Sequence, residues 1–98
     1  MDVQVVLNGI TFVWNVDKTQ LNPEKHDGVT FSQAAEAFFD PFLVVIDASR
    51  NEEDRDAVIG FDRRLRLLYV VFTERENETI RIISARRATR QEREYYEI

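Results

Sequence analysis

The fold is decided by residues 62–87, which read DRRLRLLYVVFTERENETIRIISARR. Leu67–Phe72 is apolar at every position, which predicts a central strand covered on both faces. Polar turns are expected near Asp62-Arg63 and Glu76-Asn77-Glu78, and a further strand over Thr79–Ser84. Two such short turns favour an antiparallel meander.

The N-terminal residues predict a β-hairpin. Two strand-like runs, Val3–Leu7 and Ile10–Trp14, are joined by Asn8-Gly9, a dipeptide typical of a type I′ turn. The polar stretch that follows, Asn15–Gly28, is expected to be helical in its first half, because Pro23 ends or kinks a helix.

Capping boxes predict where two further helices begin. Thr30 with Gln33 opens a helix over Phe31–Phe39, which Asp40-Pro41 ends. Thr89 with Glu92 opens a terminal helix that runs through Tyr95. Further strands are expected over Phe42–Asp47 and Ala57–Phe61. The whole chain, 1–98, therefore predicts a single α+β domain: an antiparallel β-sheet with two or three helices packed on it, preceded by the N-terminal hairpin.

Composition excludes several classes of site. The 98 residues include no cysteine, one histidine and three dispersed glycines, so we expect no metal site, no nucleotide loop and no cofactor. No apolar run approaches the roughly 20 residues of a membrane helix, so we expect a cytoplasmic protein without membrane contact.

The charge is unevenly distributed along the chain. Net charge is −5, which argues against a general nucleic-acid binder. Residues 1–62 contain four basic and twelve acidic side chains, whereas residues 63–98 contain nine arginines and six acidic side chains. Arginine binds phosphate with two hydrogen bonds, so a cluster near the C-terminus indicates a phosphodiester site. The cationic candidates are Arg81, Arg86, Arg87, Arg90 and Arg93, with Lys25 and His26 approaching from the first helix.

Each candidate also has an ordinary structural interpretation. Arg90 and Arg93 can be exposed charges of a solvated helix, and His26 can cap a helix instead of acting as an acid or base. Arg81 and Arg86 are five residues apart and lie on opposite faces of a regular strand. They share a face only if the chain bends or bulges near Ser84-Ala85.

Several motifs resemble the BrnT family of toxins. The similarity begins with Trp14, Lys18, Asn22, Lys25-His26 and the run Gly28–Phe31, and continues with Phe39-Asp40-Pro41, with Arg55 and Ile59-Gly60, and with Thr73-Glu74-Arg75. The most specific block is RIISARRAT, residues 81–89, followed by Glu92-Arg93 and Tyr95. The match covers roughly residues 10–98.

This resemblance implies a RelE-like fold and a ribonuclease toxin of a type II toxin–antitoxin pair. It implies an RNA substrate, arrest of translation, and a BrnA-type antitoxin that binds DNA, so that the toxin contacts DNA only indirectly in a dimer or heterotetramer. We expect Arg86, Arg55, Arg81 and His26 to act in catalysis, and Lys25, Arg87, Arg90 and Arg93 to bind RNA.

Three departures from the family pattern keep a second hypothesis open. Asn15 replaces the acid after the tryptophan, Asp27 is inserted between His26 and Gly28, and the chain is acidic. The alternative to an active ribonuclease is a toxin-like binding module that acts with a DNA-binding antitoxin in operon repression. An enzyme of small-molecule metabolism is a third and weaker possibility.

Overall fold

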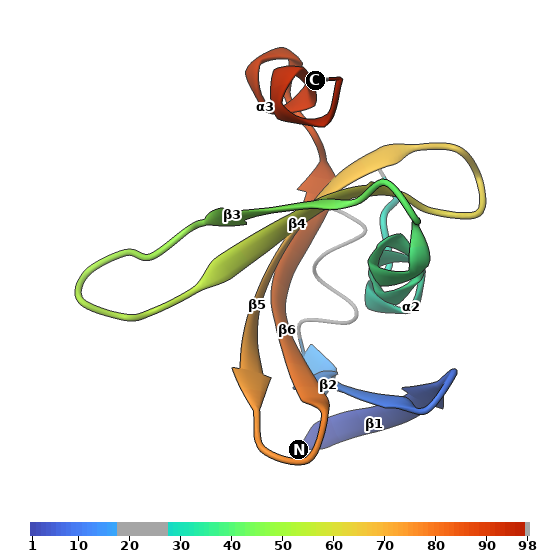
Figure 1. Cartoon of the computed structure of the whole chain (residues 1–98). Helices are drawn as coiled ribbons and strands as arrows, with labels where there is room; N and C mark the ends of the chain where they lie inside the picture. Colours follow the sequence, from blue (N-terminus) through green and yellow to red (C-terminus); the bar gives the residue numbers. More distant parts are fainter. Residues whose placement is uncertain (18–27, 98) are drawn as a thin grey trace.

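The computed structural model describes residues 1–17 and 28–97 (Figure 1). Within these residues one six-stranded sheet carries two short α-helices and a 3₁₀ turn. The strands are β1 (Asp2–Leu7), β2 (Ile10–Asn15), β3 (Val44–Asp47), β4 (Asp56–Phe61), β5 (Leu67–Arg75) and β6 (Thr79–Arg87), and the helices are α2 (Phe31–Glu36), η1 (Ala37–Phe39) and α3 (Arg90–Tyr96). The helix expected in the first half of Asn15–Gly28 falls mostly on residues 18–27, outside the described part.

The expected meander is confirmed. The strand order is β1-β2-β6-β5-β4-β3, and β5 pairs antiparallel with both β4 and β6. Leu68, Val70 and Phe72 of β5 are buried, whereas Tyr69 and Val71 between them are partly exposed. The expectation of full cover on both faces is therefore wrong for the middle of β5, because only one face is packed under α2 and η1.

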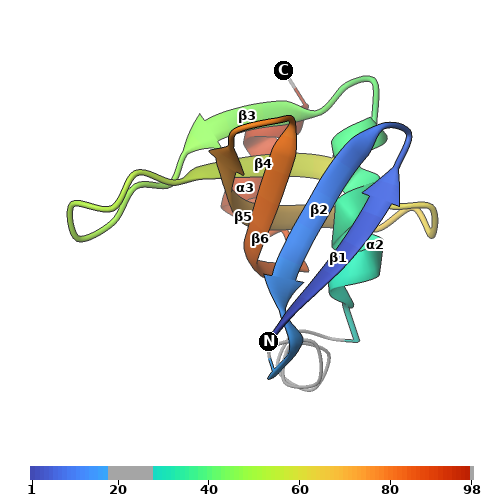
Figure 2. The same ribbon diagram turned by 90° about the horizontal axis from the view of Figure 1, so that it is seen from below.

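The N-terminal hairpin is confirmed, and it joins the sheet in an unexpected direction. Asn8 and Gly9 have φ values of 49° and 83°, as a type I′ turn requires. β2 then pairs parallel with β6 through Thr11↔Thr79 to Val13↔Arg81, and Figure 2 shows β1, β2 and β6 side by side. The sheet is therefore mixed, not antiparallel throughout. Turn signals determine only the pairing of strands that follow each other, whereas the β2–β6 contact depends on how the chain between them crosses the sheet.

The core lies between the sheet and the segment α2–η1. Phe12 and Trp14 of β2 are buried against this segment, and Trp14 meets Phe31 edge-on with ring centroids 6.0 Å apart. The capping box at Thr30 and Gln33 is present. The α-helix ends at Glu36, however, and tightens into η1 before Asp40, so the expected continuous helix over Phe31–Phe39 is corrected at its last turn.

Gly60 allows η1 to lie directly on β4. A Cβ atom at this position would lie 2.7 Å from the backbone oxygen of Ala37, which is closer than van der Waals contact permits. The next residue, Phe61, points to the opposite face, where its ring meets that of Tyr96 of α3. The helices α2 and α3 therefore pack on opposite faces of the sheet.

Asp40 connects three elements. Its Oδ1 accepts a hydrogen bond from the Phe42 N–H at 2.9 Å, and its Oδ2 accepts from the Phe61 N–H at 2.8 Å and from the Tyr96 hydroxyl at 2.7 Å. The carboxylate thus ties the end of η1 to β4 and to the last turn of α3.

Among the described residues, no helix has the length and apolar character needed to cross a membrane.

Candidate functional site

Two of the candidate arginines, Arg81 and Arg86, project from the sheet face opposite α2. We call it the arginine face. On it, Tyr69 of β5 lies opposite Arg86 of β6, and Thr73 lies opposite Arg81. Tyr69 and Thr73 are four residues apart in a strand whose side chains alternate, so both arginines project from the same face.

A β-bulge in β6 brings about this arrangement. Val71 pairs with Ser84, whereas the next residue, Phe72, pairs with Ile82, so that β6 contains one more residue than β5 at this point. The bulge lies beside the Ser84-Ala85 position where a bend was required for Arg81 and Arg86 to share a face. The condition set by their odd spacing is therefore met.

Arg86 is held in place on three sides. Its Nη1 and Nη2 donate to Glu92 Oε1 and Oε2 at 2.7 and 2.8 Å, and Nη1 also donates to the Arg87 carbonyl at 3.2 Å. Its guanidinium carbon lies 4.4 Å from the centre of the Tyr69 ring, a distance typical of cation–π contact. The side chain keeps 35% of its surface exposed, so it remains accessible to a ligand.

The ionisation states of this cluster follow from its contacts. The hydrogen bond to Glu92 raises the pKa of Arg86. Burial opposes ionisation of Glu92, but hydrogen bonds from Arg86 and from the Thr89 N–H outweigh it and lower the pKa of Glu92. Burial, followed by the nearby charge of Glu92, raises the pKa of Tyr69, so its phenol stays protonated at neutral pH.

Arg86 lines a groove of about 360 Å³ on the arginine face. We call it the arginine groove. It is formed by the β3–β4 loop together with β5 and β6, and its lining residues are Ala48, Ser49, Arg50, Arg55, Tyr69, Val71, Ser84 and Arg86. Two of the expected catalytic residues, Arg55 and Arg86, therefore border the same groove.

Arg55 immediately precedes β4 and is oriented by the loop. Its N–H donates to Ser49 Oγ at 3.2 Å, and its carbonyl accepts from the Ala48 N–H at 2.9 Å. Its guanidinium forms an ion pair with Glu53, whose side chain is 65% exposed. An ion pair this exposed is weak, so Glu53 holds the Arg55 guanidinium only loosely.

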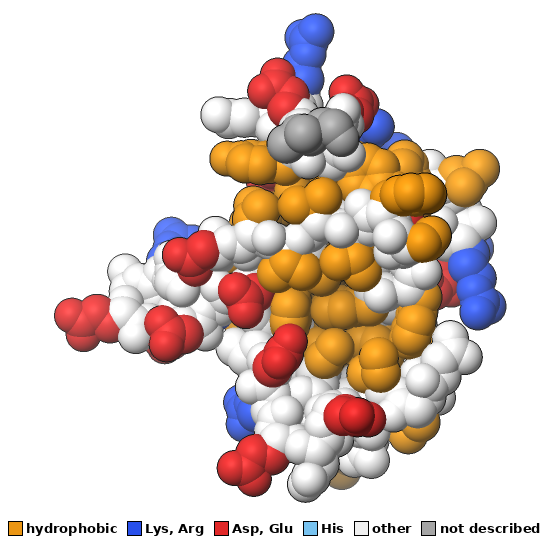
Figure 3. Space-filling view, in the orientation of Figure 1, with side chains coloured by type: hydrophobic (Ala, Val, Ile, Leu, Met, Phe, Trp, Pro, Cys, Tyr) orange, Lys and Arg blue, Asp and Glu red, His pale blue; other side chains and the backbone are white. Residues whose placement is uncertain are grey.

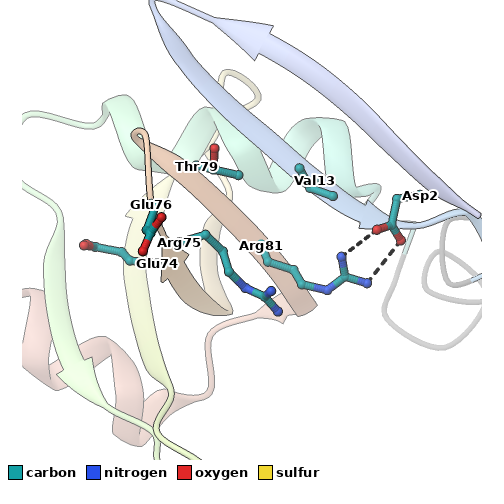
Figure 4. A pocket seen from close by; sticks show the side chains of 7 residues that line it. All are labelled: Asp2, Val13, Glu74, Arg75, Glu76, Thr79 and Arg81. Atoms are coloured by element: carbon teal, nitrogen blue, oxygen red, sulfur yellow. Dashed lines mark hydrogen bonds and ion pairs between the residues drawn. The ribbon is translucent and has the colours of Figure 1, made fainter.

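Arg81 lies at a different part of the arginine face. Its partner Thr73 is separated from Tyr69 by four residues, or about 13 Å of strand. Both Arg81 Nη atoms donate to the Asp2 carboxylate, at 2.9 and 3.2 Å, and these hydrogen bonds lower the pKa of Asp2 (Figure 4). The surrounding pocket also contains Arg75, Glu74 and Glu76, so its carboxylates outnumber its guanidinium groups.

The structure does not bring the other candidates into the groove. Arg87 ends β6, and Arg90 and Arg93 lie on α3, all three exposed and none among the groove's lining residues. Lys25 and His26 fall outside the described residues. The view in Figure 3 shows many apolar and acidic side chains with a few scattered arginines, so that side of the molecule offers little attraction to an anion.

Sequence reasoning missed several residues of this site. Tyr69, Ser84, Arg50 and Glu92 were not among the expected site residues: Tyr69 was assigned to a strand, Ser84 to a strand and the family motif, and Glu92 to a helix cap and the same motif. A period-2 alternation shared with Val71 could have placed Tyr69 on the arginine face, but no sequence signal pairs Glu92 with Arg86. Within the described part of the chain, no group of three or more His, Cys, Asp or Glu side chains is arranged to hold a metal ion.

A family model described as a ribonuclease toxin, BrnT, of type II toxin–antitoxin systems matches residues 14–92. The matched range runs from the end of β2 to the first turn of α3 and contains Arg55, Arg81 and Arg86, whereas β1 lies outside it. No curated protein matches the chain.

Proposed function

This chain belongs to the BrnT family of ribonuclease toxins of type II toxin–antitoxin systems, and on that premise we propose that it cleaves RNA in the arginine groove without a metal ion. One observation carries the proposal: Arg86, fixed against Tyr69 and Glu92, borders the same groove as Arg55 and Arg50. Three guanidinium groups around one groove suit an anionic phosphodiester.

RNA contains its own nucleophile. The ribose 2′-oxygen attacks the adjacent phosphorus, the bond from phosphorus to the 5′-oxygen breaks, and a 2′,3′-cyclic phosphate and a 5′-hydroxyl are formed. The 2′-OH proton passes to a base, and the leaving 5′-oxygen receives a proton. Negative charge grows on the phosphoryl oxygens during the attack, and Arg86 and Arg55 stabilise it there. We propose His26 as the acid or base.

The finer features of the system are proposals that the resemblance supports. As a type II toxin the protein has an antitoxin partner. We propose that the antitoxin is of the BrnA type, that the pair forms a heterotetramer that contacts DNA through the antitoxin, and that the toxin is RelE-like and arrests translation in the cytoplasm. Arg87, Arg90 and Arg93 would bind RNA outside the groove.

One observation favours the second candidate function, a catalytically weak module in operon repression. The guanidinium groups of Arg55, Arg81 and Arg86 each pair with a carboxylate, from Glu53, Asp2 and Glu92 respectively. These carboxylates reduce the positive potential that attracts RNA. Measured cleavage by the purified protein separates the two functions.

The test is cleavage of a short RNA by purified toxin in the presence of a metal chelator. We expect cleavage by the parent, and a loss of about 10²–10³ in rate for Arg86→Ala, the effect typical of removing one donor that stabilises transition-state charge. Arg64→Ala is the matched control, since Arg64 is an exposed arginine of the β4–β5 turn that does not line the groove. Unchanged cleavage by a folded Arg86→Ala protein would remove Arg86 from the reaction, and an inactive parent would favour the binding module.

A further inference from the structure

The guanidinium of Arg86 has one edge left for a ligand. Arginine has five N–H donors. Both Nη1 protons are used by Glu92 and by the Arg87 carbonyl, and one Nη2 proton is used by Glu92. Among the described residues, no protein acceptor is bound to Nε–H or to the second Nη2–H. These two donors lie on the same edge of the guanidinium, and a parallel pair of this kind matches two oxygens of a phosphate.

We propose that Glu92 is a positioning residue, which fixes Arg86 by its far end so that the Nε–Nη2 edge faces the phosphate in the arginine groove. The inference rests on the proposed function. Glu92 holds the guanidinium from one end while the Tyr69 ring covers one flat side at 4.4 Å. A donor pair held in this way loses little side-chain freedom when the phosphate binds.

Glu92 is itself firmly held. Its Oε1 also accepts the Thr89 N–H at 2.9 Å, and its own N–H donates to Thr89 Oγ1 at 3.2 Å, so that it closes the capping box of α3. Its side chain is only 16% exposed. If the phosphate displaced Glu92 from Arg86, the carboxylate of Glu92 would be left charged, unpaired and poorly solvated. The phosphate therefore binds the free edge of Arg86 while Glu92 stays in place.

The other end of α3 is tied down separately. The Tyr96 hydroxyl donates to Asp40, and the Tyr96 ring meets Phe61 at a centroid distance of 5.2 Å. None of the residues of α3 is fully buried. The position of the helix therefore depends on its contacts at Glu92 and at Tyr96. We call the pair of hydrogen bonds between Glu92 and Arg86 the clamp.

Substitutions at α3 separate the clamp from the helix cap. Glu92→Gln keeps a side chain suited to the capping box but removes the charge and one of the two acceptors for Arg86. Glu92→Ala removes clamp and cap together. Thr89→Ala removes only the hydroxyl part of the cap and is the matched control. Each variant is compared with the parent in single-turnover cleavage of a short RNA, in binding of the uncleavable DNA analogue of that RNA, and in thermal unfolding.

We expect the single-turnover rate to fall about 10-fold in Glu92→Gln and about 10²-fold in Glu92→Ala, as for a misplaced catalytic group. Thr89→Ala should lower the unfolding temperature yet cleave within about 3-fold of the parent. Nitrogen-15 NMR of the arginine side chains supplies a readout independent of cleavage. A clamped guanidinium rotates slowly, so the Arg86 Nη signals should be resolved in the parent and in Thr89→Ala and should average in Glu92→Ala.

Each outcome decides the proposal. Equal or faster cleavage by Glu92→Gln would mean that Glu92 competes with the phosphate, and the proposal would fall. Averaged Arg86 Nη signals in the parent would also overturn it. If the parent does not cleave RNA, the proposed function fails, and the clamp is then judged by the NMR signals and by weaker binding of the DNA analogue to Glu92→Ala.

Discussion

Replacing Asp40 by asparagine tests how the fold supports the site. The carboxylate accepts three hydrogen bonds with two oxygens, from the N–H groups of Phe42 and Phe61 and from the hydroxyl of Tyr96. An asparagine has the same shape but only one oxygen. If that oxygen accepts from Phe61 and Tyr96, the amide NH₂ faces the Phe42 N–H and that hydrogen bond is lost. The two remaining hydrogen bonds then have a neutral acceptor in place of a charged one.

The expected loss of unfolding free energy in Asp40→Asn follows from the kind of hydrogen bond that is lost. A hydrogen bond to a charged group contributes about 1.5–3 kcal/mol, and because Asp40 is partly exposed we take the lower end, about 1.5 kcal/mol. For a domain of this size that corresponds to a fall in unfolding temperature of roughly 6–12 °C. The Tyr96 hydroxyl then donates to a neutral amide oxygen in place of a carboxylate, and this weaker bond loosens α3. Asp40→Asn should therefore also slow RNA cleavage through Arg86, although Asp40 does not line the groove.

The pH dependence has a defined sign. Burial raises the pKa of Asp40, but its hydrogen bonds outweigh burial and bring the pKa below its ordinary value of 3.8. The stabilisation is therefore complete above pH 3.8 and is lost as the pH falls through the lower value of the folded protein. Burial and the bond to Asp40 raise the pKa of Tyr96 to about 12, so its contribution is present below pH 10.0 and is lost as the pH rises towards 12.

Urea unfolding of parent and variant at neutral and acidic pH measures these effects. Asp47→Asn is the control, because Asp47 accepts hydrogen bonds from Ser49 only two residues away in an exposed turn, and should change stability by less than about 0.5 kcal/mol. The stability difference between parent and Asp40→Asn should shrink as the pH falls below 3.8. Equal urea midpoints for parent and Asp40→Asn at neutral pH would refute the reasoning.

Two further substitutions test the packing and the extent of the site. Gly60→Ala should cost about 1–3 kcal/mol in urea unfolding, because its methyl group meets the backbone oxygen of Ala37 at 2.7 Å; a variant as stable as the parent would show that η1 shifts freely. Arg81→Ala should cleave RNA within about 3-fold of the parent, since Arg81 pairs with Asp2 roughly 13 Å of strand away from Arg86. A loss as large as that of Arg86→Ala would place Arg81 in the reaction.

The elements themselves could be predicted from the sequence, because their signals are local. The Asn8-Gly9 turn depends on two residues that tolerate positive φ, and the boxes at Thr30 and Thr89 depend on hydrogen bonds within four residues. The central position of Leu67–Phe72 followed from its apolar composition and from the short turns on either side. Such features depend on a few neighbouring residues and not on the rest of the fold.

The sheet's mixed topology was decided only by the tertiary structure. The parallel contact of β2 with β6 joins residues such as Val13 and Arg81 that are far apart in the chain, and no turn links them. The close approach of η1 to β4 at Gly60 is of the same kind. Both depend on the packing of the segment α2–η1 against Phe12 and Trp14, which is a property of the assembled core.

The candidate site divides in the same way. The sequence and its family resemblance indicated Arg86, Arg55, Arg81 and His26 as the expected catalytic residues, without showing which of them lie together. The sequence also predicted that Arg81 and Arg86 share a face only if the strand bulges. Whether the strand bulges depends on the register of β6 against β5. That register follows from the packing of Ile82 and Ala85, which are both buried in the core. The pairing of Arg86 with Glu92 depends in turn on where α3 docks, through Tyr96 and Asp40. Long-range contacts of this kind have no periodicity in the chain, so only the folded structure determines them.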